Sequence, residues 1–177
     1  MSSQNIRAIT RLSTGMVWLI PIIGFFSLLL PALYWVANID VIWFGDNNLV
    51  LADNPPIDER RLIGVVAVTP ALIVWLMALI QLQFLFRRFR RGAVFDLTAV
   101  KHLQAYALYA GLTALLTVAG SGARRWAQGE FSDAPLWTHI QISLEHWLLI
   151  FTAAIFYFVS FVIKEAKAYK DEAEDYV

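Results

Sequence analysis

Residues 62–91 read LIGVVAVTPALIVWLMALIQLQFLFRRFRR. The first 25 of them, 62–86, carry no charge, and four arginines then follow within five positions. At about 1.5 Å per residue, a helix needs about 20 apolar residues to cross roughly 30 Å of hydrocarbon. The uncharged part is long enough to do so, and a basic cluster is typical of the cytoplasmic end of a span. We therefore predict a transmembrane helix over 62–90.

Three further segments are free of Asp, Glu, Lys and Arg. They contain 28 residues (12–39), 21 residues (103–123) and 17 residues (147–163). The last is short for a span unless the preceding Glu145 and His146 enter the headgroup region. We predict an all-α fold in which residues 1–177 form a single membrane domain, an antiparallel bundle of four transmembrane helices. The predicted helices cover about 14–38, 62–90, 97–120 and 134–170.

The composition excludes several classes of protein. Hydrophobic residues make up 59% of the chain and charged residues 16%, against about 45–50% and 25% in an average soluble domain. The chain has no cysteine, which excludes a disulfide framework, a thiolate zinc site and a cysteine nucleophile. Its formal charge is zero, so no excess of basic residues predicts direct binding of nucleic acid.

Lysines and arginines divide unevenly between the two sides that four helices would create. Ten fall on the side that holds both termini and the 87–91 cluster, and four fall opposite, at Arg60, Arg61, Arg124 and Arg125. Because positive charge in short loops favours the cytoplasm, we predict that both termini are cytoplasmic.

The connecting segments carry turn signals. In the outer loop 40–61, apolar residues 41–44 and 49–51 flank Gly45-Asp46-Asn47-Asn48, which predicts a small hairpin or an apolar segment on the membrane surface. The short inner segment 92–95 precedes Asp96, a residue type that caps helix N-termini. Residues 171–177 form an acidic tail, which is either solvated or in contact with the arginines or a cytosolic partner.

The 97–120 helix is rich in small residues. Ala107 and Gly111, like Ala110 and Ala114, are four positions apart, a spacing that allows close approach of membrane helices. This pattern fits packing within the bundle or, alternatively, a homo-oligomer interface.

Two groups of residues are candidates for function. The first is the arginine cluster at the cytoplasmic end of the second helix, which would contact anionic lipid or a soluble partner: Arg87, Arg88, Arg90 and Arg91. The second is polar and lies near the outer end of the fourth helix: His139, Glu145 and His146. Helical spacing would place His139 and His146 on one face with Ser143. This second group is either a hydrated helix end or part of a proton or ligand pathway.

Neither group predicts an enzyme or a metal site. His139 and His146 are seven residues apart, roughly 10 Å along a helix, so they cannot share one ion without another ligand. The chain contains no phosphate-binding glycine loop, nucleophile elbow or paired-acid motif. We therefore predict no catalytic residue, no cofactor and no metal ligand.

Two stretches together resemble a known family. The first is FLFRRFRRGAVF (84–95), which runs into VKHL (100–103), and the second is KEAKAYKDE (164–172), which continues to Val177. They are similar to a family of bacterial four-helix inner-membrane proteins catalogued as a domain of unknown function, with a basic Gly-x-x-Phe inner loop and an acidic C-terminal helix. Tyr169 stands where that family more often has leucine.

The resemblance implies a bacterial inner-membrane protein with no assigned enzyme activity. Members of that family are often encoded beside small helix-turn-helix regulators, which implies a small cytosolic regulator as a partner. We expect a non-enzymatic membrane adaptor or sensor. The alternative is a component of a small-solute or proton pathway that uses His139, Glu145 and His146.

Overall fold

The computed structural model describes residues 3–35, 42–45, 48–51, 61–91, 96–127, 140 and 142–175. This part of the chain contains four long helices and one β-hairpin. The elements are α1 (Ser3–Trp35), β1 (Ile42–Gly45), β2 (Asn48–Leu51), α2 (Arg61–Arg90), α3 (Leu97–Ala127) and α4 (Leu144–Asp175).

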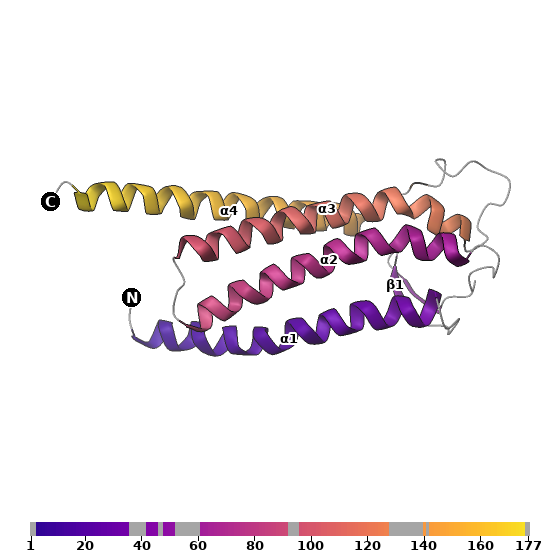
Figure 1. Ribbon diagram of the computed structural model, residues 1–177, viewed down its shortest axis with the longest axis horizontal. Helices are drawn as coiled ribbons and strands as arrows, with labels where there is room; N and C mark the ends of the chain where they lie inside the picture. The colour runs from indigo at the N-terminus through magenta and orange to yellow at the C-terminus, as the bar shows by residue number, and fades with distance from the viewer. Residues whose placement is uncertain are drawn as a thin grey trace.

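The helices lie side by side and alternate in direction (Figure 1). α1 packs on α2, α2 on α3 and α3 on α4, and no other pair of helices has an extensive interface in the described part of the chain. The predicted all-α fold of four antiparallel helices is therefore confirmed. We call the end where α1 begins and α2 ends at Arg90 the arginine end, and the opposite end, where α1 ends and α2 begins, the hairpin end.

All four helices are long and apolar enough to cross a membrane. Many of their large apolar side chains point outward: Trp18, Leu62 and Phe158 are 71%, 73% and 66% exposed. Much of the interior is built from small residues such as Ala78 and Ala114, both fully buried, as expected where lipid takes the place of water around a bundle. The protein is a multi-pass membrane protein.

The small residues of α3 pack inside the chain. Ala107, Ala110 and Ala114 are buried, and a Cβ added at Gly111 would lie 3.8 Å from the Cβ of Ala153 on α4. This face of α3 is therefore occupied by neighbouring helices. It gives no support to the predicted homo-oligomer, which stays a prediction.

Two helices extend well beyond the predicted bounds. α1 begins at Ser3 rather than near 14, because residues 3–14 contain neither proline nor glycine to end the helix. α3 continues to Ala127 rather than 120. It passes through Gly120 because that residue meets the α2 backbone, where a Cβ would lie 2.7 Å from the carbonyl oxygen of Ala67.

The predicted start of the fourth helix is wrong. Ile140, Ile142 and Ser143 are not helical, and α4 begins at Leu144 rather than at 134. At its other end α4 continues to Asp175, so most of the predicted acidic tail 171–177 is helical. Lysine and acidic residues four positions apart, such as Lys167 and Asp171, favour this extension.

The predicted hairpin is present in the 40–61 loop. β1 and β2 pair antiparallel, with Ile42 opposite Leu51 and Gly45 opposite Asn48. The rest of that loop lies outside the described residues, as do the 92–95 turn and residues 128–139.

Candidate functional site

An ion pair joins the two helices at the arginine end. Arg88, in the last turn of α2, binds the carboxylate of Asp96, which directly precedes α3. The other carboxylate oxygen accepts a hydrogen bond from the backbone N–H of Thr98 at 3.2 Å. The carbonyl oxygen of Asp96 accepts from the N–H of Val100 at 3.2 Å. Asp96 is therefore the N-cap of α3, as predicted, and it fixes one of the four arginines.

The same contacts set the charge of Asp96. The hydrogen bond from the Thr98 backbone holds the pKa of Asp96 below its ordinary value, and the positive charge of Arg88 lowers the pKa further. The carboxylate is thus ionised at neutral pH, in the form that both the cap and the ion pair require.

The other three arginines of the cluster point away from the bundle. Arg87, Arg90 and Arg91 are exposed, whereas Arg88 is partly covered. Phe86, which directly precedes the cluster, and Phe89, which lies within it, pack edge to face with ring centroids 6.0 Å apart. The cluster therefore divides into one structural arginine and three that can contact groups outside the protein.

Exposed cations from the other three helices extend this basic surface. Arg11 on α1, Lys101 on α3 and Lys164 on α4 are exposed and lie in the halves of their helices nearer the arginine end. Such a surface favours binding of lipid phosphates or protein carboxylates.

A second polar contact joins α2 to α3, about two helical turns further from the arginine end. The Nδ1 atom of His102 lies 2.7 Å from the Oε1 atom of Gln81, and the His102 ring packs on Phe84 with centroids 5.5 Å apart. An amide oxygen only accepts, so Nδ1 donates in this contact. The His102–Gln81 contact and the Arg88–Asp96 pair together hold the end of α2 against the start of α3.

The second predicted group is not assembled as expected. Because residues 140, 142 and 143 are not helical, His139, Ser143 and His146 cannot share a helical face, and His139 itself lies outside the described residues. Glu145 is exposed. The Nδ1 atom of His146 accepts from the backbone N–H of Ser143 at 3.1 Å and lies 2.6 Å from its hydroxyl.

This arrangement is a helix cap in which Ser143 is the N-cap and His146 replaces the usual Glu or Gln three residues later. His146 thus has a structural role at the start of α4. Among the described residues, no three His, Asp or Glu side chains are grouped closely enough to hold a metal ion.

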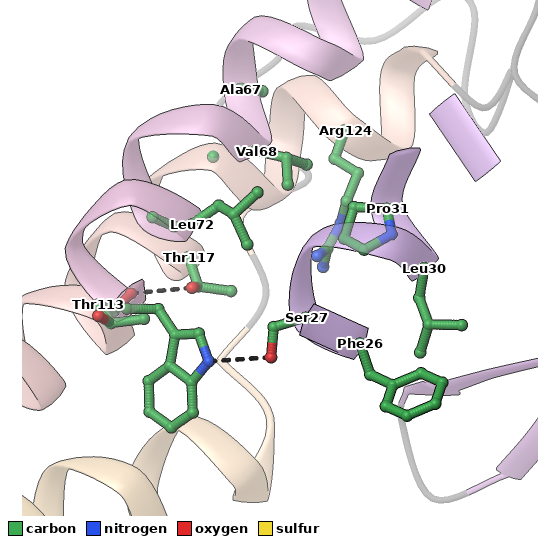
Figure 2. Close-up of a pocket in the computed structure, with 13 residues that line it drawn as sticks. Phe26, Ser27, Leu30, Pro31, Ala67, Val68, Leu72, Thr113, Thr117 and Arg124 are labelled. Carbon is green, nitrogen blue, oxygen red and sulfur yellow. Dashed lines mark hydrogen bonds between the residues drawn. The ribbon is translucent and has the colours of Figure 1, made fainter. Parts of the chain in front are cut away.

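Sequence reasoning missed a cavity of about 330 Å³ between α1, α2 and α3. Figure 2 shows the side chain of Arg124, from the last turn of α3, among the residues that line it. The indole N–H of Trp75, another lining residue, donates to the Ser27 hydroxyl at 3.2 Å. No motif marks these residues, because the cavity exists only through the packing of three helices that are distant in sequence. The single signal was an arginine next to the 103–123 apolar segment.

Comparison of the chain with protein-family models, with curated proteins and with solved structures returned no match. The resemblance to a bacterial membrane family therefore stays a prediction.

Proposed function

We propose that this protein is a non-enzymatic adaptor or sensor of the bacterial inner membrane, whose arginine end recruits an acidic soluble partner. The observation that carries the proposal is that the arginine cluster contains one arginine bound within the protein and three exposed ones. Arg87, Arg90 and Arg91 are exposed at the end of one helix, while Arg88 is bound to Asp96 and holds that helix end in place.

A fixed basic surface suits recognition of carboxylates. An arginine side chain offers five N–H donors in a rigid plane and can bind a carboxylate through two parallel hydrogen bonds. Holding the helix end rigid reduces the entropy lost when such contacts form. A small cytosolic regulator with an acidic surface has the chemistry required, and anionic lipid would occupy the same side chains when the partner is absent.

The orientation belongs to the same proposal. Both termini and the arginine end would face the cytoplasm, since ten of the fourteen lysines and arginines are on that side and positive charge is retained there during insertion. The partner would then meet the surface directly from solution.

The test is affinity purification from membranes after brief crosslinking. The test variant changes Arg87, Arg90 and Arg91 together to glutamine. The matched control changes Arg61, Arg124 and Arg125 to glutamine, which removes the same charge from the hairpin end, away from the basic surface.

We expect a soluble protein to be recovered with the wild type and the control but lost with the test variant, at equal expression and unchanged topology. Equal recovery with both variants, or equal loss from both, would contradict a partner site at the three arginines.

A further inference from the structure

Two prolines lie inside α1, and each removes one backbone hydrogen bond from the helix. Pro21 has no N–H to donate to the carbonyl oxygen of Val17, four residues earlier. A side chain of α2 replaces that donor, since the Nε2 atom of Gln83 donates to the Val17 carbonyl oxygen at 3.1 Å. The carbonyl that Pro21 frees is thus satisfied by a neighbouring helix, as is usual for prolines within a membrane.

Pro31 frees a second carbonyl, that of Ser27, beside the cavity between α1, α2 and α3. Both Pro31 and Ser27 line this cavity. Within the described residues, no side chain donates to the Ser27 carbonyl oxygen as Gln83 does to that of Val17. The cavity wall therefore contains a hydrogen-bond acceptor whose usual helical donor is missing.

The hydroxyl group of Ser27 adds a donor at the same position. The indole N–H of Trp75 donates to the oxygen of this hydroxyl (Figure 2). Because an indole only donates, the Ser27 oxygen is the acceptor and its own proton stays available. In the described part of the chain, the hydroxyl makes no other hydrogen bond. Ser27 therefore offers one donor and one acceptor, and the bond from Trp75 polarises the hydroxyl and strengthens it as a donor.

The rest of the cavity wall offers little polar chemistry. The Thr113 and Thr117 hydroxyls donate to the carbonyl oxygens of Tyr109 and Thr113, both at 2.8 Å. Arg124 already has an interaction within the protein, so its charge is not counted as part of the site. Most of the remaining lining is apolar. A hydrocarbon group fits such a wall without leaving buried polar groups unsatisfied.

The depth of Ser27 requires that its ligand be neutral. The membrane span of α1 ends at Trp35, and Ser27 lies eight residues before that end, about 12 Å along the helix axis. One leaflet contributes about 15 Å of hydrocarbon, so Ser27 lies well below the headgroups, where an ion is costly. A hydroxyl is the simplest neutral group that both donates and accepts a hydrogen bond.

From these features we infer that the cavity binds a neutral, lipid-soluble alcohol. Its hydroxyl group accepts from the Ser27 hydroxyl and donates to the Ser27 carbonyl oxygen, and its hydrocarbon part lies along the apolar wall. The cavity volume, about 330 Å³, is at the lower end of the range for small-molecule sites. Because α1 and α3 share no extensive interface in the described part of the chain, the ligand can enter between them from the bilayer. This site is separate from the arginine end, and its occupancy does not depend on a soluble partner.

The experiment is photoaffinity labelling of the purified, delipidated full-length protein in neutral detergent. The probe is a long-chain alcohol with a photoreactive diazirine in its chain, and mass spectrometry locates and counts the labelled residues. The competitors are decanol, its methyl ether and decane. The test variant is Pro31→Ala, which restores an N–H donor for the Ser27 carbonyl oxygen. The matched control is Pro70→Ala, the same substitution inside α2 at a residue that does not line the cavity.

We expect the probe to label residues that line the cavity and decanol to displace it better than the ether, which accepts a hydrogen bond but cannot donate one. This advantage of decanol over the ether should fall about two- to tenfold in Pro31→Ala, the loss of one neutral hydrogen bond, and should persist in Pro70→Ala. Partition of a competitor into detergent does not depend on the variant, so the change reports on the site. An unchanged advantage in Pro31→Ala, or equal weakening of all three competitors, would overturn the inference.

A second variant tests the apolar wall and also serves if Pro31→Ala fails to fold. Val68→Phe adds bulk to a residue that lines the cavity without changing any hydrogen-bonding group. We expect labelling of the cavity residues to fall at least about tenfold, because the hydrocarbon part of the probe loses its space, while circular dichroism remains that of the wild type. Unchanged labelling of a folded Val68→Phe protein would place the ligand elsewhere and overturn the inference.

Discussion

The ring of Trp35, the last residue of α1, lies directly over Gly64 in the first turn of α2. A Cβ atom at position 64 would overlap the ring carbons, and Trp35 is only 3% exposed. The ring also packs edge to face on Tyr34, with centroids 5.1 Å apart, and both join Ala127 in a buried cluster. The contact between α1 and α2 at the hairpin end therefore depends on the missing side chain of Gly64.

Gly64→Ala should destabilise the protein by about 1–3 kcal/mol, the usual cost of overpacking a well-filled contact. Gly15→Ala, in α1, is the control, because no atom lies within 4 Å of a Cβ placed at that position. That control should be neutral or slightly stabilising, since alanine favours helix over glycine. Thermal unfolding in detergent measures both, and equal stability of the two variants would contradict the account of the Trp35 contact.

Asp96→Ala should destabilise the protein, because it removes the N-cap of α3 and the partner of Arg88. Asp96→Asn keeps a good capping side chain and loses only the ion pair, which is partly exposed and so contributes little to stability. We expect the asparagine variant to lie between the wild type and alanine in an unfolding titration. If both variants lost the same stability, the effect of Asp96 would come from its negative charge alone and not from capping.

Asp96 also predicts a dependence of stability on pH. Its pKa is lowered in the folded protein, so the unfolded chain binds this proton more readily than the folded chain. The stabilisation is therefore fully present above about pH 4 and is lost as the pH falls through the lowered pKa. Unfolding curves of the wild type and Asp96→Asn should converge as the pH is lowered. A constant difference between them across this range would show that Asp96 does not supply the acid sensitivity.

Two substitutions of His146 test whether this residue caps the start of α4 or carries protons. His146→Gln places a standard capping-box residue at the same position and should leave stability and hydrogen exchange at the start of α4 close to wild type. His146→Leu removes the acceptor for Ser143, so the first turn should exchange faster. If His146→Gln abolished a measured proton flux while the cap stayed intact, the structural role would be insufficient to describe His146.

Much of the fold follows from the distribution of charge along the chain. The uncharged segments set the number of spans, and the short 92–95 connection sets the antiparallel pairing of the second and third helices. The hairpin and the Asp96 cap were also predictable, because turn-forming and capping residues act over a few positions.

The ends of the helices were less predictable where packing overrides the local preference of the sequence for ending or continuing a helix. The run Gly120–Ser121–Gly122 looks like a helix end, yet α3 continues through it because Gly120 allows contact with Ala67 on α2. Conversely, residues 140–143 look helical in sequence, but Ser143 forms a cap and the helix begins one residue later.

The candidate sites divide in the same way. The basic end of α2 was visible in the sequence, but the binding of Arg88 to Asp96 was not, because it needs the geometry of the turn. The Arg124 cavity could not be predicted, since its wall combines residues from α1, α2 and α3 that share no spacing or motif.

The most direct test of the central claim, a four-span protein that presents its arginine end to the cytoplasm, is the accessibility of single introduced cysteines. The chain has none of its own, so Arg90→Cys at one end and Ile142→Cys, exposed just before α4 at the other, report on the two ends without background. In intact cells, a membrane-impermeant thiol reagent that reaches the outer face of the membrane should label position 142 and spare position 90 until the membrane is opened. Labelling of position 90 before that step, with position 142 protected, would contradict the orientation and with it the proposed recruitment of a cytosolic partner.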